Sequence, residues 1–161
     1  MISFLITTKN EGLYIDGLLT QLSRCVEPGD EIVIVDDYSD DIDTLEILDK
    51  WRKSDELEDV IVFFQHHLNH DFASHKNFGL DKCTQPWIFQ IDADELMAEA
   101  VEEYIHNVLQ TNESFDLLLI PRINTVDGLT DEDIVKFGWK VNENGWVNFA
   151  AYLGCHTIFI L

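Results

Sequence analysis

A chain of 161 residues is long enough for one compact domain that buries about 70% of the surface its unfolded form exposes. Its 31 acidic residues outnumber 10 basic ones, and the net charge of -21 gives a field that repels nucleic-acid backbones and anionic lipid surfaces. We therefore expect no stable nucleic-acid binding, although a divalent cation can invert the sign of such a field inside one small pocket.

The three cysteines, Cys25, Cys83 and Cys155, are widely spaced and form no CxxC pair, so we expect neither a disulfide framework nor a zinc site. No apolar stretch approaches the roughly eighteen residues of a transmembrane segment. The apolar N-terminus has no basic flank or cleavage site of the kind found in signal peptides. These features predict a first strand at the N-terminus, no transmembrane segment and a cytoplasmic location.

Five apolar runs of strand length recur along the chain, each nearly continuous, as in strands covered on both faces. Between them, apolar residues recur at helical spacing. Strands alternating with helices predict an α/β fold with a Rossmann-related, mainly parallel sheet flanked by helices on both faces. The predicted strands are Ile2–Thr7, Glu31–Val35, Val60–Phe64, Trp87–Ile91 and Phe115–Ile120, and the predicted helices are marked by Leu13–Leu22, Leu45–Trp51, Phe72–Leu80 and Met97–Val108.

The pattern changes from about Arg122, where Asn, Asp, Gly and Trp replace the regular apolar spacing. Here we expect a long loop, a short helix near Asp131–Phe137 and a strand near Trp146–Tyr152. The last residues, Thr157–Leu161, lie inside an apolar run that has no polar tail. We therefore expect the chain to be the first portion of a longer protein.

Three of the predicted strands end in polar clusters. In an open parallel sheet, ligands bind beyond the carboxyl ends of the strands, so these clusters are the candidates for a binding site. In chain order the clusters are Thr7-Thr8-Lys9-Asn10-Glu11, Asp36-Asp37-Tyr38-Ser39-Asp40 and Asp92-Ala93-Asp94-Glu95.

Each acidic cluster is ambiguous when it is considered alone. Asp92 and Asp94 lie two residues apart, and in an extended segment both carboxylates would share a face and approach one hard cation such as Mg or Mn. Asp36 and Asp37 either cap the following helix or accept hydrogen bonds from a base or ribose. For both pairs, taken singly, a helix cap or solvated strand end is the more common role.

The order of the clusters, together with Lys76-Asn77-Phe78-Gly79-Leu80, resembles the N-terminal pattern of family 2 glycosyltransferases with the GT-A fold. Four matches in order over about 100 residues are more specific than a lone DXD motif. Three residues differ from the usual pattern of that family: Lys9 replaces a common aromatic residue, Tyr38 a common glycine and Lys76 a frequent arginine. These differences leave the choice of nucleotide open.

The resemblance implies a role for each matching residue. Asp94 would coordinate a Mn or Mg ion that bridges the two phosphates of a nucleotide-diphosphate sugar, with a UDP-sugar favoured. Asp92 would contact the ribose or the metal, and Asp37 would face the base. The other residues implied to line the donor pocket are Thr7, Lys9, Glu11, Lys76 and Asn77.

The resemblance further implies sugar transfer with inversion to a glycan or lipid-linked acceptor, as in polysaccharide biosynthesis. Residues 1–121 would bind the donor, and residues 122–161 would begin an incomplete acceptor-side region of the same structural domain. An inverting transfer needs a base that deprotonates the acceptor. We name no catalytic base, because a solvated loop and a helix cap are the favoured roles of the later acids, Asp127, Asp131, Glu132 and Asp133.

Two other classes of function are considered. A nucleotidyltransferase would show a glycine-rich basic phosphate loop near the first strand, and Thr7-Thr8-Lys9-Asn10-Glu11-Gly12 is not one. A module that binds a nucleotide sugar without transferring it stays open, because the acceptor-side residues of the family lie later in the chain.

Other polar and aromatic residues have more ordinary explanations. For His66, His67 and His70 the spacing favours a polar loop over a transition-metal site, while His75 has a better claim to face a ligand. Core packing and contact with an acceptor sugar are equally good interpretations of Trp139 and Trp146.

Overall fold

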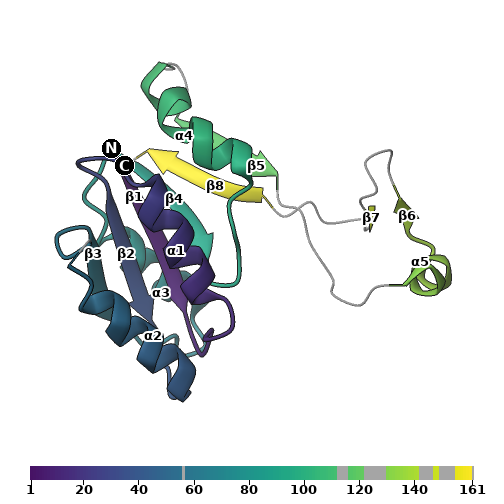
Figure 1. The fold of residues 1–161 in the computed structure, drawn as a ribbon, viewed down its shortest axis with the longest axis horizontal. Coiled ribbons are helices and arrows are strands. Elements are labelled where there is room, and N and C mark those ends of the chain that lie inside the picture. The colour runs from purple at the N-terminus through teal and green to yellow at the C-terminus, as the bar shows by residue number, and fades with distance from the viewer. Residues whose placement is uncertain (56, 112–115, 122–129, 142–146, 149–154, 161) are drawn as a thin grey trace. The chain divides into compact units, whose positions relative to one another are not determined.

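The computed structural model describes residues 1–55, 57–111, 116–121, 130–141, 147–148 and 155–160. Strands and helices alternate along its first two thirds, as predicted (Figure 1). In chain order the elements are β1 (Ile2–Thr8), α1 (Ile15–Cys25), β2 (Glu31–Asp36), α2 (Ile42–Arg52), β3 (Ile61–Gln65), α3 (Phe72–Leu80), β4 (Trp87–Asp92), α4 (Glu99–Thr111), β5 (Leu117–Pro121), α5 (Asp131–Phe137), β6 (Lys140–Val141), β7 (Val147–Asn148) and β8 (Cys155–Ile160).

The central sheet has the strand order β3-β2-β1-β4-β8-β5. The four strands β3, β2, β1 and β4 are parallel, and β8 pairs antiparallel with β4. Parallel neighbours need crossover connections, and here α1, α2 and α3 supply them. The prediction of a mainly parallel α/β sheet is therefore confirmed.

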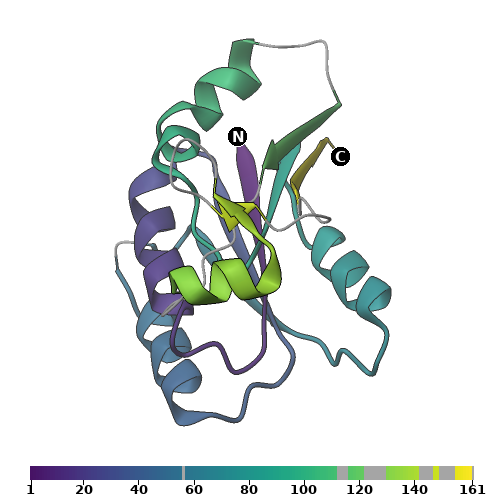
Figure 2. The same ribbon diagram turned by 90° about the vertical axis from the view of Figure 1, so that its right-hand side faces the viewer.

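The crossover helices cover both faces of this parallel sheet. In Figures 1 and 2, α1 and α2 lie on one face and α3 lies on the other. The central strand β1 is buried on both sides, since every one of its residues is buried except Thr7, which is half-buried. This arrangement explains why the strands read as continuous apolar runs rather than as alternating ones.

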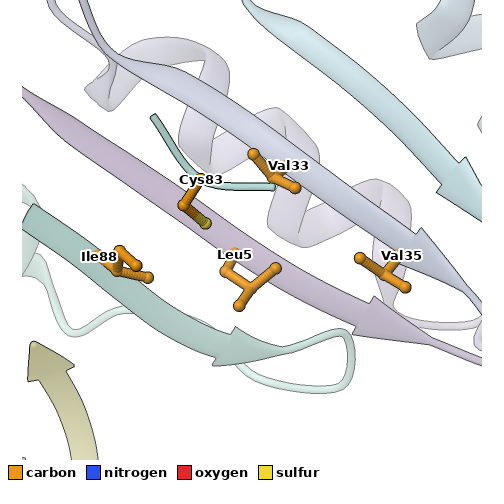
Figure 3. Packing of buried hydrophobic residues seen from close by; sticks show 5 residues of the cluster. All are labelled: Leu5, Val33, Val35, Cys83 and Ile88. Carbon is orange, nitrogen blue, oxygen red and sulfur yellow. The ribbon is translucent and has the colours of Figure 1, made fainter. Parts of the chain in front are cut away.

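On the face under α3, Leu5 of β1 packs with Val33 and Val35 of β2 and with Ile88 of β4, beside Cys83 (Figure 3). α3 lies close to this cluster because Gly79 has no side chain. A Cβ built on Gly79 would lie 2.8 Å from a methyl carbon of Leu5. Lys76 lies one turn before Gly79 on the same face of α3, so this close approach also directs Lys76 towards the sheet.

The contacts divide the chain into two compact units, residues 1–118 with 157–161 and residues 119–156. In the second unit, α5 begins with a capping box between Thr130 and Asp133 and is followed by the short antiparallel pair β6 and β7. The predicted short helix at Asp131–Phe137 is confirmed. Of the strand predicted near Trp146–Tyr152, the structure describes Val147–Asn148 as β7, and the remainder lies outside the described residues.

Two helix starts differ from the prediction. The backbone N–H groups of Tyr14 and Ile15 both donate to the Glu11 carbonyl, and this turn leaves Leu13 86% exposed before α1 begins. Met97 is buried, but Gln21 of α1 holds its backbone N–H and carbonyl through two hydrogen bonds of 2.8 Å, and α4 begins later, at Glu99. Apolar spacing marked both residues as helical, whereas local hydrogen bonds determine where the helices start.

Candidate functional site

The three polar clusters predicted at strand ends lie side by side in the sheet. In the parallel register, Thr7 of β1 is paired with Asp92 of β4, and Thr8 of β1 is paired with Asp36 of β2. The loops that carry Lys9 and Asp37 leave the sheet from these same strand ends. The parallel arrangement thus brings residues between positions 7 and 94 together at the end of the sheet where the parallel strands terminate. We call this end the carboxyl edge of the sheet.

Lys76 joins α3 to two of these strand ends. Its Nζ donates a 2.6 Å hydrogen bond to Asp92 Oδ1 and a 2.7 Å hydrogen bond to Thr7 Oγ1. Only 7% of Lys76 is exposed, whereas the Asp92 side chain is 42% exposed. A buried ammonium is strongly unfavourable unless it is paired, so Asp92 and Thr7 stabilise Lys76 in this position.

Lys9 joins the loops after β1 and β2. Its Nζ donates to the backbone carbonyls of Asp37, at 2.5 Å, and Tyr38, at 2.7 Å. Asn10 braces the same junction, because its side chain both donates to Asp40 Oδ1 and accepts from the Asp40 N–H. Asn10 and Tyr38 have φ values of 56° and 50°, which place both in the left-handed region that non-glycine residues seldom adopt. This loop junction is thus held in one conformation by several polar contacts.

Asp37 lies in the site without capping a helix. Its Oδ1 accepts a 2.9 Å hydrogen bond from the Leu68 N–H and lies 3.7 Å from His67 Nδ1. Burial acts to raise the pKa of Asp37, but the Leu68 hydrogen bond and the charges of Lys9 and the nearby histidines hold that pKa below its ordinary value. Asp37 is therefore a carboxylate that stays charged near neutral pH.

The capping interpretation of the Asp36-Asp37 pair is wrong. The N-cap of α2 is Asp41, whose Oδ2 accepts from the Thr44 N–H at 2.8 Å. Asp36 instead accepts from the N–H and hydroxyl of Ser39 and closes the turn after β2. The helix begins six residues after β2 ends, which is too far for the strand-end acids to act as its cap.

A second acidic group surrounds the end of β4. The strand ends at Asp92, and Asp94 lies exposed in the following turn. The two residues therefore do not lie in one extended segment, contrary to the expectation from the sequence. Across the site, the pKa of Glu11 is raised by its own burial and by the negative charges of Asp94, Asp41 and Asp92. Negative charge from two loops therefore converges beside the Asp92-Ala93-Asp94 turn.

This donor set fits a divalent metal ion that is shared with a ligand. Asp92 and Asp94 offer the oxygen atoms that Mn and Mg prefer, and a cation would offset the repulsion that Glu11 experiences. In the part of the chain that the structure describes, no three His, Cys, Asp or Glu residues are grouped so as to hold a metal by themselves. Phosphate and water oxygens would have to complete the coordination.

Three histidines lie beside the site, on the β3–α3 loop and on α3. His66 Nδ1 lies 3.2 Å from His75 Nδ1, and the His66 ring stacks on Phe78. Burial, and then the neighbouring His66, lower the pKa of His75, which favours its neutral form. His67 stacks on Tyr38 with ring centroids 3.9 Å apart. These contacts hold the β3–α3 loop against the site.

Among the later acids, Asp133 is part of the α5 capping box, and its hydrogen bonds to Thr130 lower its pKa. Asp131 and Glu132 lie in the first turn of the same helix, while Asp127 lies outside the described residues. Trp139 stacks on Phe137 at 4.9 Å within the second unit, and Trp146 lies outside the described residues. Within the described residues, no helix is both long and apolar enough to span a membrane.

The sequence reasoning missed the residues that organise the loops. Asn10, Ser39 and Leu68 bind other parts of the site through their side chains or backbone. Asn10 and Ser39 lie in the predicted clusters but were given no role, and Leu68 was not predicted at all. A signal existed for Asn10, because asparagine tolerates the left-handed conformation and often bonds to nearby backbone. Asn77, by contrast, lies on the exposed side of α3.

Comparisons with known proteins agree on one family. A family model described as glycosyl transferase family 2 matches residues 3–160. The chain is 31% identical over 112 residues to a lipopolysaccharide core biosynthesis glycosyltransferase, LpsC, of Rhizobium meliloti (strain 1021), covering 70% of this chain and 38% of that protein.

Two solved structures have the same fold. One is S. aureus TarS 1-349 in complex with UDP-GlcNAc, with a TM-score of 0.62, 25% identity and coverage of 80% of this chain and 36% of that one. The other is the mannosyltransferase PcManGT from Pyrobaculum calidifontis in complex with GDP-Man and Mn²⁺, with a TM-score of 0.62, 20% identity and coverage of 74% and 34%. The chain thus spans less than half the length of each of these relatives, and its fold is GT-A-like, as predicted.

Proposed function

This chain belongs to glycosyl transferase family 2, and from that membership we propose that it binds a nucleotide-diphosphate sugar and transfers the sugar to a saccharide or lipid-linked acceptor. The observation that carries the proposal is the convergence of Asp37, Lys76 and Asp92 at the carboxyl edge of the sheet. Ligands of open α/β sheets bind at this edge.

In the proposed donor site, Asp37 accepts a hydrogen bond from the base, because its carboxylate is partly enclosed and its pKa is held below the ordinary value. Thr7 and Glu11 line the nucleoside pocket, and Lys9 holds the backbone of Asp37 and Tyr38 in place. UDP is favoured over other nucleotides, since the TarS structure at 25% identity holds UDP-GlcNAc. Asp92 lies where it can contact the ribose or a metal.

A Mn or Mg ion would be held by Asp94 and Asp92 and would stabilise the negative charge that grows on the departing nucleoside diphosphate. Support for this part of the proposal comes from the concentration of negative charge around Glu11. The mannosyltransferase structure, which holds Mn²⁺, supports it by analogy. Such an ion also explains how a chain with a net charge of -21 could hold a diphosphate.

The acceptor side of the proposal rests on the relatives alone. The lipopolysaccharide core biosynthesis enzyme favours a saccharide or lipid-linked acceptor and a role in polysaccharide biosynthesis. Transfer with inversion follows from the family resemblance, and no described acid is assigned as the base. The family membership argues against a nucleotidyltransferase.

A non-catalytic donor-binding module is the second candidate, because the chain spans only 38% of its enzyme relative. A pair of assays separates the candidates. The proposed enzyme raises its melting temperature with UDP-sugar and Mn²⁺ and hydrolyses or transfers the sugar. A melting shift with no turnover supports the binding module. The absence of any shift with UDP- or GDP-sugars, in the presence of Mn²⁺, contradicts both.

A further inference from the structure

Lys76 is a fixed positive charge inside an acidic edge. It lies on the face of α3 that packs against β1, and only 7% of it is exposed. Its ammonium is held by Asp92 Oδ1 at 2.6 Å and by Thr7 Oγ1 at 2.7 Å. A lysine with this degree of burial and two short hydrogen bonds is part of the structure of the free protein rather than a freely moving surface chain.

The ammonium and a metal ion would share the same carboxylate. Asp92 is one of the two acids of the proposed metal site, and one of its oxygens already accepts the hydrogen bond from Lys76. A divalent cation bound to Asp92 would lie close to the Lys76 ammonium, because both would contact the same carboxylate. The repulsion between these two positive charges weakens metal binding. Asp94, the other acid, is exposed, so its attraction for a cation is reduced by solvent.

We propose that Lys76 is a built-in counter-ion that masks Asp92 from divalent cations, so that Mn²⁺ binds firmly only together with a nucleoside diphosphate. This inference rests on the proposed function and adds to it that metal binding depends on nucleotide binding. A diphosphate brings negative charges that attract both cations, and they offset the repulsion between the ammonium and the metal. Metal and nucleotide then strengthen each other's binding, a coupling that is reciprocal by thermodynamic necessity.

The two simpler roles of Lys76 make different predictions. If Lys76 only held α3 against the sheet, a neutral residue that keeps the hydrogen bonds would leave Mn²⁺ affinity unchanged. If Lys76 contacted the diphosphate without masking Asp92, that residue would weaken UDP binding more than uridine binding and would also leave Mn²⁺ affinity unchanged. Only the masking role predicts that removing the charge strengthens Mn²⁺ binding in the absence of nucleotide.

The test is Mn²⁺ binding to the nucleotide-free protein, measured by the electron paramagnetic resonance signal of free Mn²⁺. Lys76→Gln removes the charge and keeps a hydrogen-bond donor, and Lys76→Arg keeps the charge. Lys82→Gln is the matched control, because it removes the same charge from a lysine whose ammonium lies over the rings of Phe64 and Phe78. Circular dichroism establishes that each variant is folded, and Lys76→Met replaces Lys76→Gln if the latter does not fold.

We expect Lys76→Gln to bind Mn²⁺ about tenfold more tightly than the unchanged protein, with Lys76→Arg and Lys82→Gln unchanged. A gain of less than about threefold, or an equal gain in Lys82→Gln, overturns the masking role. Because this titration contains no nucleotide, its failure leaves the donor site standing. The proposed function fails separately, if the unchanged protein binds neither UDP nor GDP in the presence of Mn²⁺.

Discussion

The two ends of the parallel sheet both carry polar networks, but the networks differ in burial. At the amino end, Asp30 is 6% exposed and accepts from the Ile2 N–H at 2.7 Å, from the Glu27 N–H at 2.9 Å and, when His106 Nε2 carries the proton, from that imidazole at 2.6 Å. His106 belongs to α4, so this network fixes α4 to the start of β1. The side chains of Asp30 and His106 are almost fully buried and are hydrogen-bonded to each other.

At the carboxyl edge, the equivalent polar groups are only partly covered. Asp92 is half-exposed and Asp94 is exposed. Four non-glycine residues of the loops at this edge are held in the left-handed region, namely Asn10, Tyr38, Asn69 and His70. Backbone strain of this kind is found mostly where a site must keep a particular shape. The difference in burial fits the roles that we propose, in which the buried network contributes to stability and the partly open one binds a ligand. The predictions below separate the two ends.

The largest expected effect lies at the amino end. Asp30→Ala leaves the Ile2 N–H and the buried His106 without their acceptor, so we expect a loss of about 3 kcal/mol in the free energy of unfolding. Urea denaturation measures this loss. UDP binding at temperatures where the variant is folded should be unchanged, and a loss of binding without a loss of stability would reverse the roles that we assign to the two ends.

A smaller effect is expected from Asp37→Ala at the carboxyl edge. We expect uridine affinity to fall about tenfold even without metal, because the carboxylate that accepts from the base is removed. Calorimetric titration with uridine measures this change. Asp49→Ala, which removes an equal charge from the exposed side of α2, is the control and should bind uridine normally.

Lys9→Met is expected to weaken binding less, by about threefold. The lysine supports the carbonyls of Asp37 and Tyr38, so its loss should weaken uridine and UDP binding by the same factor. The ratio of the two affinities is the measurement that matters. A drop for UDP alone would show that Lys9 contacts the phosphates directly.

The smallest effect concerns pH. Because the pKa of Asp37 is held below its ordinary value, the carboxylate stays charged on acidification from pH 7 to about pH 5, and uridine affinity should be constant over that range. A group with a depressed folded-state pKa contributes stability above its unfolded pKa, and that contribution is lost as the pH falls through the folded value. A decline in uridine affinity that begins near pH 6 in the unchanged protein and is absent from Asp37→Ala would contradict this low pKa, because Asp37 itself would then be taking up a proton in that range.

The sequence predicted the strand-end acids well, because parallel strands bring their carboxyl ends together by topology alone. Asp37 and Asp92 could therefore be placed at one edge before any side chain was known. The contact of Lys76 with Thr7 spans 69 positions and depends on how closely Gly79 lets α3 approach the sheet. Spacing and composition carry no signal for such a contact.

The amino-end network was missed for a related reason. Asp30 lies in a short turn whose sequence is typical of a solvated loop, and nothing in the sequence around His106 indicates a polar partner for its ring. Only the packing of α4 brings the two together. The role of Lys9 was also not predicted. Lys9 binds backbone carbonyls of the loop after β2, and the sequence did not indicate that Tyr38 in this loop has a left-handed conformation.

The most direct test of the account is calorimetric titration of UDP into the unchanged protein and into Asp94→Ala, each with and without Mn²⁺. We predict that Mn²⁺ strengthens UDP binding to the unchanged protein, and that Asp94→Ala abolishes this metal dependence while its melting temperature, and its affinity for uridine, are unchanged. Asp94 is exposed, so the substitution should cost little stability. Equal strengthening by Mn²⁺ in both proteins would contradict the assignment of the carboxyl edge as a metal-assisted diphosphate site.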